Sequence, residues 1–168
     1  MMNPKSTVIP ILAVILFGLF LWIKWPARDI YLSDMDYTVL QAEWAQPSRD
    51  TSIEGNPIQM GGKFYTKGIG VHPTSEISVE IPQGYTYFIA EIGVDDEIKE
   101  DQPASVIFQV ASEGAILYES ALLTAPMPPH RVIINVHGLE SIKLLVTGGP
   151  DGNNADHANW ALARFAKG

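Results

Sequence analysis

Residues 76–94, EISVEIPQGYTYFIAEIGV, contain the clearest structural signal in the chain. Apolar and polar residues alternate from Glu76 to Ile81, and this period of two is typical of a β-strand with one buried face. Pro82-Gln83-Gly84 then interrupts the pattern as a turn. The aromatic and β-branched run from Tyr85 to Val94 predicts a second, longer strand in a more central position of a sheet.

The same period recurs along the rest of the chain after residue 30, where no helical stripe of convincing length occurs. A turn signal at residues 111–114 joins two of the further strands into a hairpin. These further strands are expected at 105–110, 115–119, 131–136, 141–147 and 159–165. Roughly seven to nine short strands separated by turns predict an all-β fold, and specifically a β-sandwich.

The chain has 168 residues, of which 46% are apolar and 18% charged, and this composition is typical of one globular domain. It contains no cysteine, which excludes disulfides, thiolate zinc sites and thiol nucleophiles. From Asp29 onward it carries 19 acidic and 8 basic residues. Because such an acidic surface repels phosphate backbones, we expect no nucleic-acid partner. Neutral ligands and cations suit this charge better.

An apolar segment precedes the predicted sandwich. A stretch without a charge, STVIPILAVILFGLFLWI, lies between Lys5 and Lys24. At 1.5 Å per residue, a helix of this length spans roughly 27 Å, which is enough to cross a hydrocarbon core. Trp22 and Trp25 stand at one end, where interfacial aromatic residues are common. No small-x-small cleavage pattern follows the segment, which favours an uncleaved anchor over a signal peptide.

These features divide the chain into four parts. They are a short tail at 1–6, a transmembrane anchor at 7–25, a linker at 26–30 and the predicted sandwich at 31–168. Basic residues flank the anchor almost equally, so the positive-inside rule does not orient it. Large domains translocate largely regardless of charge. We therefore expect a single-pass membrane protein with an extracytoplasmic domain.

Polar residues gather in three loops next to predicted strands. The first, KGIGVHP at 67–73, contains two glycines that permit close backbone approach, and its His72 lies beside a strand. His72 either binds a ligand or is hydrogen-bonded to a neighbour at a tight strand entry. The second loop, GVDDE at 93–97, has three adjacent carboxylates. Asp95 and Asp96 either bind calcium or sugar hydroxyls or form a solvated acidic turn, and the solvated turn is the interpretation we favour for Glu97.

The third loop, DGNNADHANW at 151–160, is rich in side-chain oxygens that suit a hard cation such as calcium. It does not match an EF-hand loop, because its glycine stands second instead of sixth. Asn and Asp are also ordinary turn formers. Trp160, at the start of the last strand, is either a core residue or a platform for a ligand, and the core role is the commoner one.

Enzymatic function has little support in the sequence. The four histidines are scattered, and no pair has the spacing of a zinc-binding helix. The chain contains no Gly-x-Ser-x-Gly elbow, P-loop or dinucleotide fingerprint. A small glycoside hydrolase that uses Asp95 or Glu97 stays open on composition alone. Because a sandwich of this size leaves little room for a deep cleft, we expect no enzyme.

The three loops, in this order and with these strands between them, resemble the NPCBM type of carbohydrate-binding module. The resemblance covers about residues 31–165 and is carried by KGIGVH, GVDDE and the DHANW ending, together with YLSDMDY, VIFQV and GAILYES. It implies a galactose-binding-like β-sandwich of jelly-roll type that binds carbohydrate without catalysis. Such modules are often appended to secreted glycoside hydrolases, and relatives with this fold often carry a structural calcium.

The three loops and this resemblance together give two sets of candidate residues. The carbohydrate-binding candidates are His72, Asp95, Asp96, Asn154, His157 and Trp160. The candidates for a structural calcium are Asp151 and Asp156. Two positions depart from the family pattern, because Ala155 stands where an aromatic residue is common and Asn159 where an acidic residue is usual.

We therefore expect a membrane-anchored, non-catalytic domain that recognises a glycan through loops at one end of its sandwich. Sugars present hydroxyl groups and an apolar face, so such a site needs polar side chains and an aromatic ring. A shallow site of this kind binds with a Kd of roughly 10 μM to 1 mM. Two alternatives stay open: an envelope scaffold that binds a protein partner, which the two departures favour, and the small glycoside hydrolase.

Overall fold

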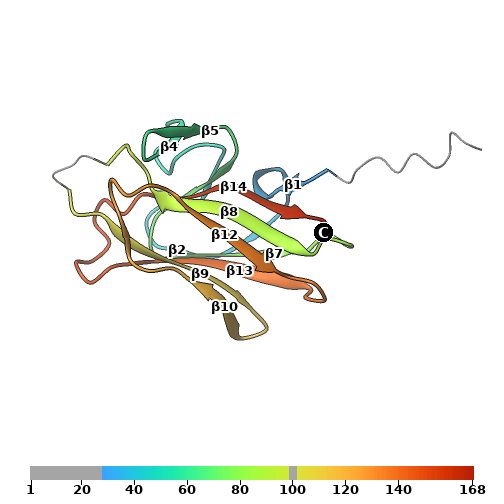
Figure 1. Cartoon of the computed structure of the whole chain (residues 1–168). Coiled ribbons are helices and arrows are strands. Elements are labelled where there is room, and N and C mark those ends of the chain that lie inside the picture. Colours follow the sequence, from blue (N-terminus) through green and yellow to red (C-terminus); the bar gives the residue numbers. More distant parts are fainter. Residues whose placement is uncertain (1–27, 99–101) are drawn as a thin grey trace, which may run out of the picture.

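The computed structural model of the chain describes residues 28–98 and 102–168. These residues form two antiparallel β-sheets packed face to face, with a two-stranded sheet on one outer face (Figure 1). Helical structure in the described residues amounts to one 3-10 turn, η2 (Leu32–Asp34). The all-β sandwich predicted from the alternating pattern is therefore confirmed.

The first sheet is built around β8 and β14. Its order is β12 (His130–Asn135), β8 (Tyr87–Val94), β14 (Ala158–Ala166), β6 (Gly68–Val71) and β3 (Ser48–Arg49), and β1 (Ile30–Tyr31) also pairs with β14. The aromatic run at 85–94, for which a central strand was predicted, forms β8. This strand pairs with β12 on one side and with β14 on the other. Its expected central position is confirmed.

The second sheet contains the predicted hairpin. Its order is β10 (Ala115–Glu119), β9 (Ser105–Ser112), β13 (Ser141–Gly148), β7 (Ser75–Glu80) and β2 (Thr38–Ala42), and β11 (Leu123–Thr124) also pairs with β9. Glu113 and Gly114 form the turn between β9 and β10, with φ angles of 51° and 81°. The positive φ values suit a two-residue hairpin turn that matches the twist of the strands.

The core lies between the two sheets. Alternate residues of β7, Ile77 and Val79, point into it, as the period of two predicts. Phe108 of β9 and Trp160 of β14 meet edge to face across the sandwich, with ring centroids 4.9 Å apart. Burial of each large apolar side chain contributes about 1.5–3 kcal/mol, so these residues hold the sheets together.

The strands before residue 72 are the part of the fold that the sequence does not predict. They include β4 (Ile58–Met60) and β5 (Lys63–Tyr65), a small hairpin that packs its buried side chains on the outer face of the first sheet. None of the strands in this region is longer than five residues, which is too short for a periodic pattern. All four residues of β6 are buried, so it shows no alternation at all.

The predicted transmembrane anchor at 7–25, together with the tail at 1–6, lies outside the described residues. Within residues 28–98 and 102–168, no helix has the length and apolar character needed to span a bilayer. The anchor therefore stays a prediction.

The sandwich has two ends, and β14 connects them. At its start, Ala158 pairs with Val94 and Val71, whereas near its finish Phe165 pairs with Ile30. Eight steps of about 3.3 Å separate the ends of this strand by roughly 26 Å. The first described residues and the C terminus therefore lie at one end, and the loop before β14 lies at the other (Figure 1).

Candidate functional site

A shallow hollow of about 380 Å³ lies at the end of the sandwich where β14 begins. Strand register brings its parts together, because Val71 pairs with Ala158 and so places His72 beside His157. The segment after β2 joins them, because the backbone N–H of Glu43 donates to Thr74 O at 3.2 Å. The residues that line the hollow are Glu43, Trp44, His72, Asn153, Asn154, Ala155 and His157.

An exposed indole is the dominant feature of this hollow. Trp44 is 56% exposed, which is unusual for so large an apolar ring. Its ring centroid lies 4.9 Å from that of His72 and 5.5 Å from that of His157, and the second pair is stacked at 21°. The two imidazoles lie 5.8 Å apart. The result is an aromatic platform with nitrogen atoms beside it.

His72 is held in one tautomer. Its Nδ1 lies 2.6 Å from the Pro73 carbonyl oxygen, which can only accept a hydrogen bond. Nδ1 therefore carries the proton, and Nε2 of the neutral ring is an acceptor. Burial lowers the pKa of His72, although the carbonyls of Pro73 and Asn153 oppose this effect. His72 is consequently neutral at neutral pH and can accept a hydrogen bond from a hydroxyl group.

His157 is oriented by a partly buried carboxylate. Its Nδ1 lies 2.7 Å from Glu97 Oε1, while Glu97 Oε2 accepts hydrogen bonds from Ser52 Oγ at 2.6 Å and Asn56 Nδ2 at 2.8 Å. Burial raises the pKa of Glu97, but these three hydrogen bonds outweigh it and the net pKa is lowered. The Glu97 side chain is only 11% exposed, so the solvated acidic turn expected for it is wrong.

Asp95 supports the site by hydrogen bonds to residues next to it. It is buried, and its carboxylate accepts hydrogen bonds from the Glu97 N–H at 2.9 Å and from Asn159 Nδ2 at 2.7 Å. Burial raises the pKa of Asp95 despite these donors. An acidic residue at position 159 would repel this carboxylate, whereas the Asn159 amide stabilises it. Asp95 therefore has a structural role, because it holds the Glu97 backbone and the Asn159 side chain in place.

Two predicted site residues lie elsewhere. Asp96 Oδ1 and Oδ2 accept hydrogen bonds from the backbone N–H groups of Gly61 and Gly62 at 2.8 and 2.7 Å, so Asp96 holds the turn of the β4–β5 hairpin. Trp160 is 1% exposed and packs in the core against Phe108. The expectation that Trp160 contacts a sugar is therefore corrected, because it packs in the core, and Asp96 lies at a turn outside the hollow.

The two calcium candidates meet at Ser105. Asp151 accepts a hydrogen bond from the Ser105 hydroxyl, and Asp156 Oδ1 accepts one from the Ser105 backbone N–H at 2.7 Å. Asp156 Oδ2 is buried without a partner, and burial raises the pKa of Asp156 to about 6. A side chain at Gly148 would meet both this oxygen and the Gly152 carbonyl, so the two acceptors lie on the same side. Among the described residues, no three His, Asp or Glu side chains form a metal-binding group.

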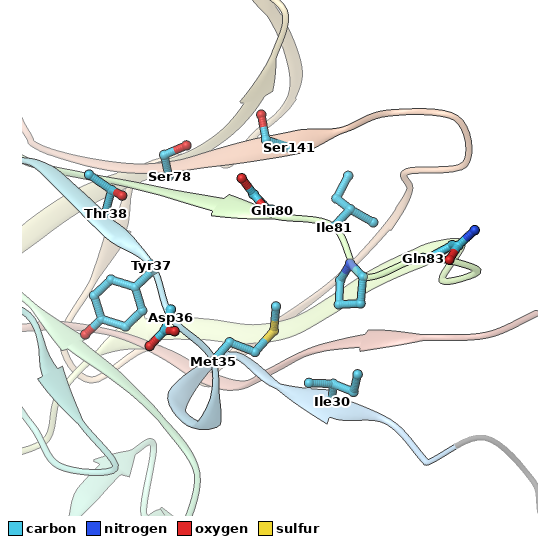
Figure 2. Close-up of a pocket in the computed structure, with 11 residues that line it drawn as sticks. Ile30, Met35, Asp36, Tyr37, Thr38, Ser78, Glu80, Ile81, Gln83 and Ser141 are labelled. Carbon is cyan, nitrogen blue, oxygen red and sulfur yellow. The ribbon is translucent and has the colours of Figure 1, made fainter.

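A larger groove of about 830 Å³ lies at the opposite end of the sandwich (Figure 2). Thr38, Ser78, Glu80, Ile81 and Ser141 line one side of it, and Met35 and Ile30 line the other. Its one aromatic ring, Tyr37, has the Arg49 guanidinium 4.2 Å from its centroid. None of the predicted site residues lines it, so the hollow at Trp44 is the better candidate.

Sequence reasoning identified His72, Asn154 and His157 but missed Trp44 and Glu43. The missed residues are separated from the histidines by more than 25 positions in the chain. One signal was available, because Trp44 stands in a polar, proline-containing segment with no alternating pattern that would bury it. A tryptophan in such a segment is a candidate for surface exposure.

The chain matches a known family over nearly all of its described length. The family model of the NPCBM/NEW2 domain matches residues 28–166. A Renibacterium salmoninarum protein named as an endo-alpha-N-acetylgalactosaminidase is 28% identical over 151 residues, or 84% of this chain and 10% of that protein. Alpha-1,3-galactosidase B of Akkermansia muciniphila is 29% identical over 142 residues, or 82% of this chain and 17% of that protein. The chain thus spans less than a fifth of these relatives.

Solved structures share the fold. The CBM51 module of GH95 from Clostridium perfringens, in complex with methyl-galactose, matches with a TM-score of 0.76 and 28% identity over 83% of this chain and 100% of that one. The CBM51-2 and INT domains of ZmpB from the same species, in complex with GlcNAc, match with a TM-score of 0.79 and 29% identity. That match covers 84% of this chain and 32% of the other. The sandwich is therefore of the CBM51 jelly-roll type.

Replacement of Glu97 tests how the site is held. Glu97→Gln removes the charge that Ser52, Asn56 and His157 stabilise, so we expect a loss of about 1–3 kcal/mol of unfolding free energy at pH 7. Because the folded-state pKa is lowered, this stability is present above the ordinary Glu pKa and is lost as the pH falls through the lower, folded value. Melting curves from pH 7 down to about pH 3 should therefore converge for the wild type and the variant.

The matched control is Glu140→Gln, an exposed carboxylate at the opposite end of the sandwich. It should leave the melting temperature nearly unchanged at every pH. Equal melting temperatures for the wild type and Glu97→Gln at pH 7 would refute the bracing role.

Proposed function

Since the chain belongs to the NPCBM/NEW2 domain family, we propose that it is a non-catalytic carbohydrate-binding module that holds one sugar unit in the hollow at Trp44. The observation that carries this proposal is the exposed indole of Trp44, which packs against two oriented imidazoles. An apolar ring left in contact with water at the centre of a polar hollow marks a binding surface.

The hollow offers a sugar both kinds of contact that it needs. The apolar C–H face of the ring stacks on Trp44, while hydroxyl groups donate to His72 Nε2 and to the Glu43 carboxylate. The side-chain amides of Asn153 and Asn154 provide donors for hydroxyl oxygens. A sugar with the wrong stereochemistry would leave these groups unpaired, which is the source of selectivity.

The relatives support this assignment. Two similar solved modules are in complex with methyl-galactose and with GlcNAc. The curated relatives are named as glycosidases, but this chain spans only 10% and 17% of their length, so their catalytic activity is not transferred to it. A module that accompanies such enzymes brings them to a glycan without itself cleaving it.

Removal of the indole tests the proposed function. Trp44→Ala should weaken binding of methyl-galactose or GlcNAc at least tenfold in isothermal titration, because the stacking surface is lost. Since Trp44 lies outside the core, the melting temperature should change little.

Phe64→Ala is the matched control, because Phe64 is 67% exposed on the β4–β5 hairpin and does not line the hollow. This variant should bind like the wild type. Folded wild-type protein that binds no member of a broad glycan panel, or equal affinities for both variants, would contradict the proposal. Stoichiometric capture of one protein, unaffected by free sugar, would instead support the scaffold alternative.

We also propose that residues 7–25 anchor the module in a membrane, with the module extracytoplasmic. The first described residues lie at the end of the sandwich opposite the hollow. An anchor at that end would present Trp44 away from the bilayer, toward glycans in front of the membrane. Many copies in one membrane would also raise avidity through their effective concentration.

Cell fractionation tests the anchor. The full chain should remain in the membrane pellet after a high-salt wash, and protease added to intact cells should remove the domain. Deletion of residues 7–25 should release it into the soluble fraction. A domain fully protected in intact cells would overturn the orientation, and a wild-type chain in the soluble fraction would overturn the anchor.

We further propose that Asp151 and Asp156 bind a calcium ion. The unpartnered Asp156 Oδ2 and the nearby Gly152 carbonyl are oxygen ligands of the kind that calcium prefers, and water would complete the six to eight positions. Calcium at about 100 times its Kd would add roughly 2.7 kcal/mol of stability.

Chelator should therefore lower the melting temperature of the wild type, and added calcium should restore it. Asp156→Asn should melt at the same temperature with and without calcium, because its side chain has lost the charge. Identical wild-type melting curves in calcium and in chelator would refute the calcium site.

A further inference from the structure

The hollow at Trp44 is surrounded by negative charge. Glu43 lines it directly. Glu97 lies behind His157, and Glu54 Oε1 lies 4.0 Å from His157 Nε2. A ligand in this hollow would therefore contact the Glu43 carboxylate, with two further carboxylates beside His157.

Six of the eight described Lys and Arg side chains form contacts away from the hollow. Lys63 forms an ion pair with Glu91, Lys143 with Glu76 and Arg164 with Asp29. Lys67 forms ion pairs with both Asp34 and Asp50. Arg49 and Lys167 lie over Tyr37 and Tyr85. In the part of the chain that the structure describes, no Lys or Arg side chain lines the hollow.

Acceptors also outnumber strong donors in the hollow. His72 is more than nine-tenths buried, and its Nε2 is an acceptor because Nδ1 carries the proton toward the Pro73 carbonyl. The Glu43 carboxylate receives only long hydrogen bonds, from Gln41 Nε2 at 3.2 Å, Thr74 N at 3.4 Å and Asn153 Nδ2 at 3.5 Å. Among the described residues, the His72 Nε2 lone pair and the Glu43 carboxylate therefore receive no short hydrogen bond.

We infer that the hollow selects a sugar that carries a free amino group, namely a de-N-acetylated hexosamine. This inference rests on the proposed function. A protonated amine has only donors, so it satisfies His72 Nε2 and Glu43 together, and it is attracted to the face of the Trp44 indole. N-acetylation removes the charge and adds an acceptor, while a carboxylated sugar would be repelled by the surrounding carboxylates.

Pairs of sugars that differ only at this group test the inference. Isothermal titration of the full chain would compare glucosamine with GlcNAc and galactosamine with GalNAc, at about pH 6.5 where the amine is protonated. In about 20 mM salt the amine should bind three- to fivefold more tightly, as an exposed ion pair allows, and the advantage should shrink toward onefold in about 0.5 M salt. Galacturonic acid should bind more weakly than galactose.

Variants locate the preference on Glu43. Glu43→Gln should lower the ratio of amine to N-acetyl affinity toward one, whereas Glu140→Gln, with the same change in net charge, should keep it. Equal binding of amine and N-acetyl sugars, or the same ratio in both variants, overturns the amine preference and leaves the proposed function intact. Absence of binding by every sugar in the set overturns both.

Discussion

The register of β14 between its two neighbours is the constraint on which the rest of the site depends. Ala158 pairs with Val94 of β8 on one side and with Val71 of β6 on the other. The chain that enters β14 must therefore meet the chain that leaves β6 and β8. A slip of one residue would turn Trp160 from the core to the outer face, so the buried indole holds this register in place. The core thus determines which loops come together.

Burial of charge at this end of the sandwich is compensated by local donors. Within residues 28–98 and 102–168 Asp95 has no cationic partner, but a side-chain amide and backbone N–H groups donate to its carboxylate. Glu97 has a hydroxyl, an amide and an imidazole. Buried charges of this kind are tolerated only when their lone pairs are satisfied. Ser52 and Asn56 hold the Glu97 carboxylate in place, and this carboxylate in turn orients the imidazole of His157, which lines the hollow.

The sequence predicts most of the second sheet and half of the first, because long half-buried strands leave a period of two. β7 and β8 are examples, and the Ala111-to-Gly114 turn signal located the β9–β10 hairpin within two residues. Within the site, the histidines were predicted from the loops that carry them. Trp44 was not, because its contacts with His72 and His157 depend on the pairing of distant strands. Asp96 lies outside the hollow because its carboxylate accepts hydrogen bonds from the turn of the β4–β5 hairpin, which the sequence does not predict.

The two departures from the family pattern favoured a protein-binding scaffold when only the sequence was considered, and the structure gives each of them a physical role. Asn159 donates to Asp95, where a second carboxylate would add repulsion in a buried setting. Ala155 lines the hollow with a small side chain and a φ of 60°, and the aromatic surface comes instead from Trp44 on the segment after β2. An aromatic ring supplied from a second loop still leaves a flat apolar surface beside oriented polar groups. Both departures therefore have a physical role within this chain: the Asn159 amide stabilises a buried carboxylate, and the small Ala155 side chain leaves the hollow at Trp44 open.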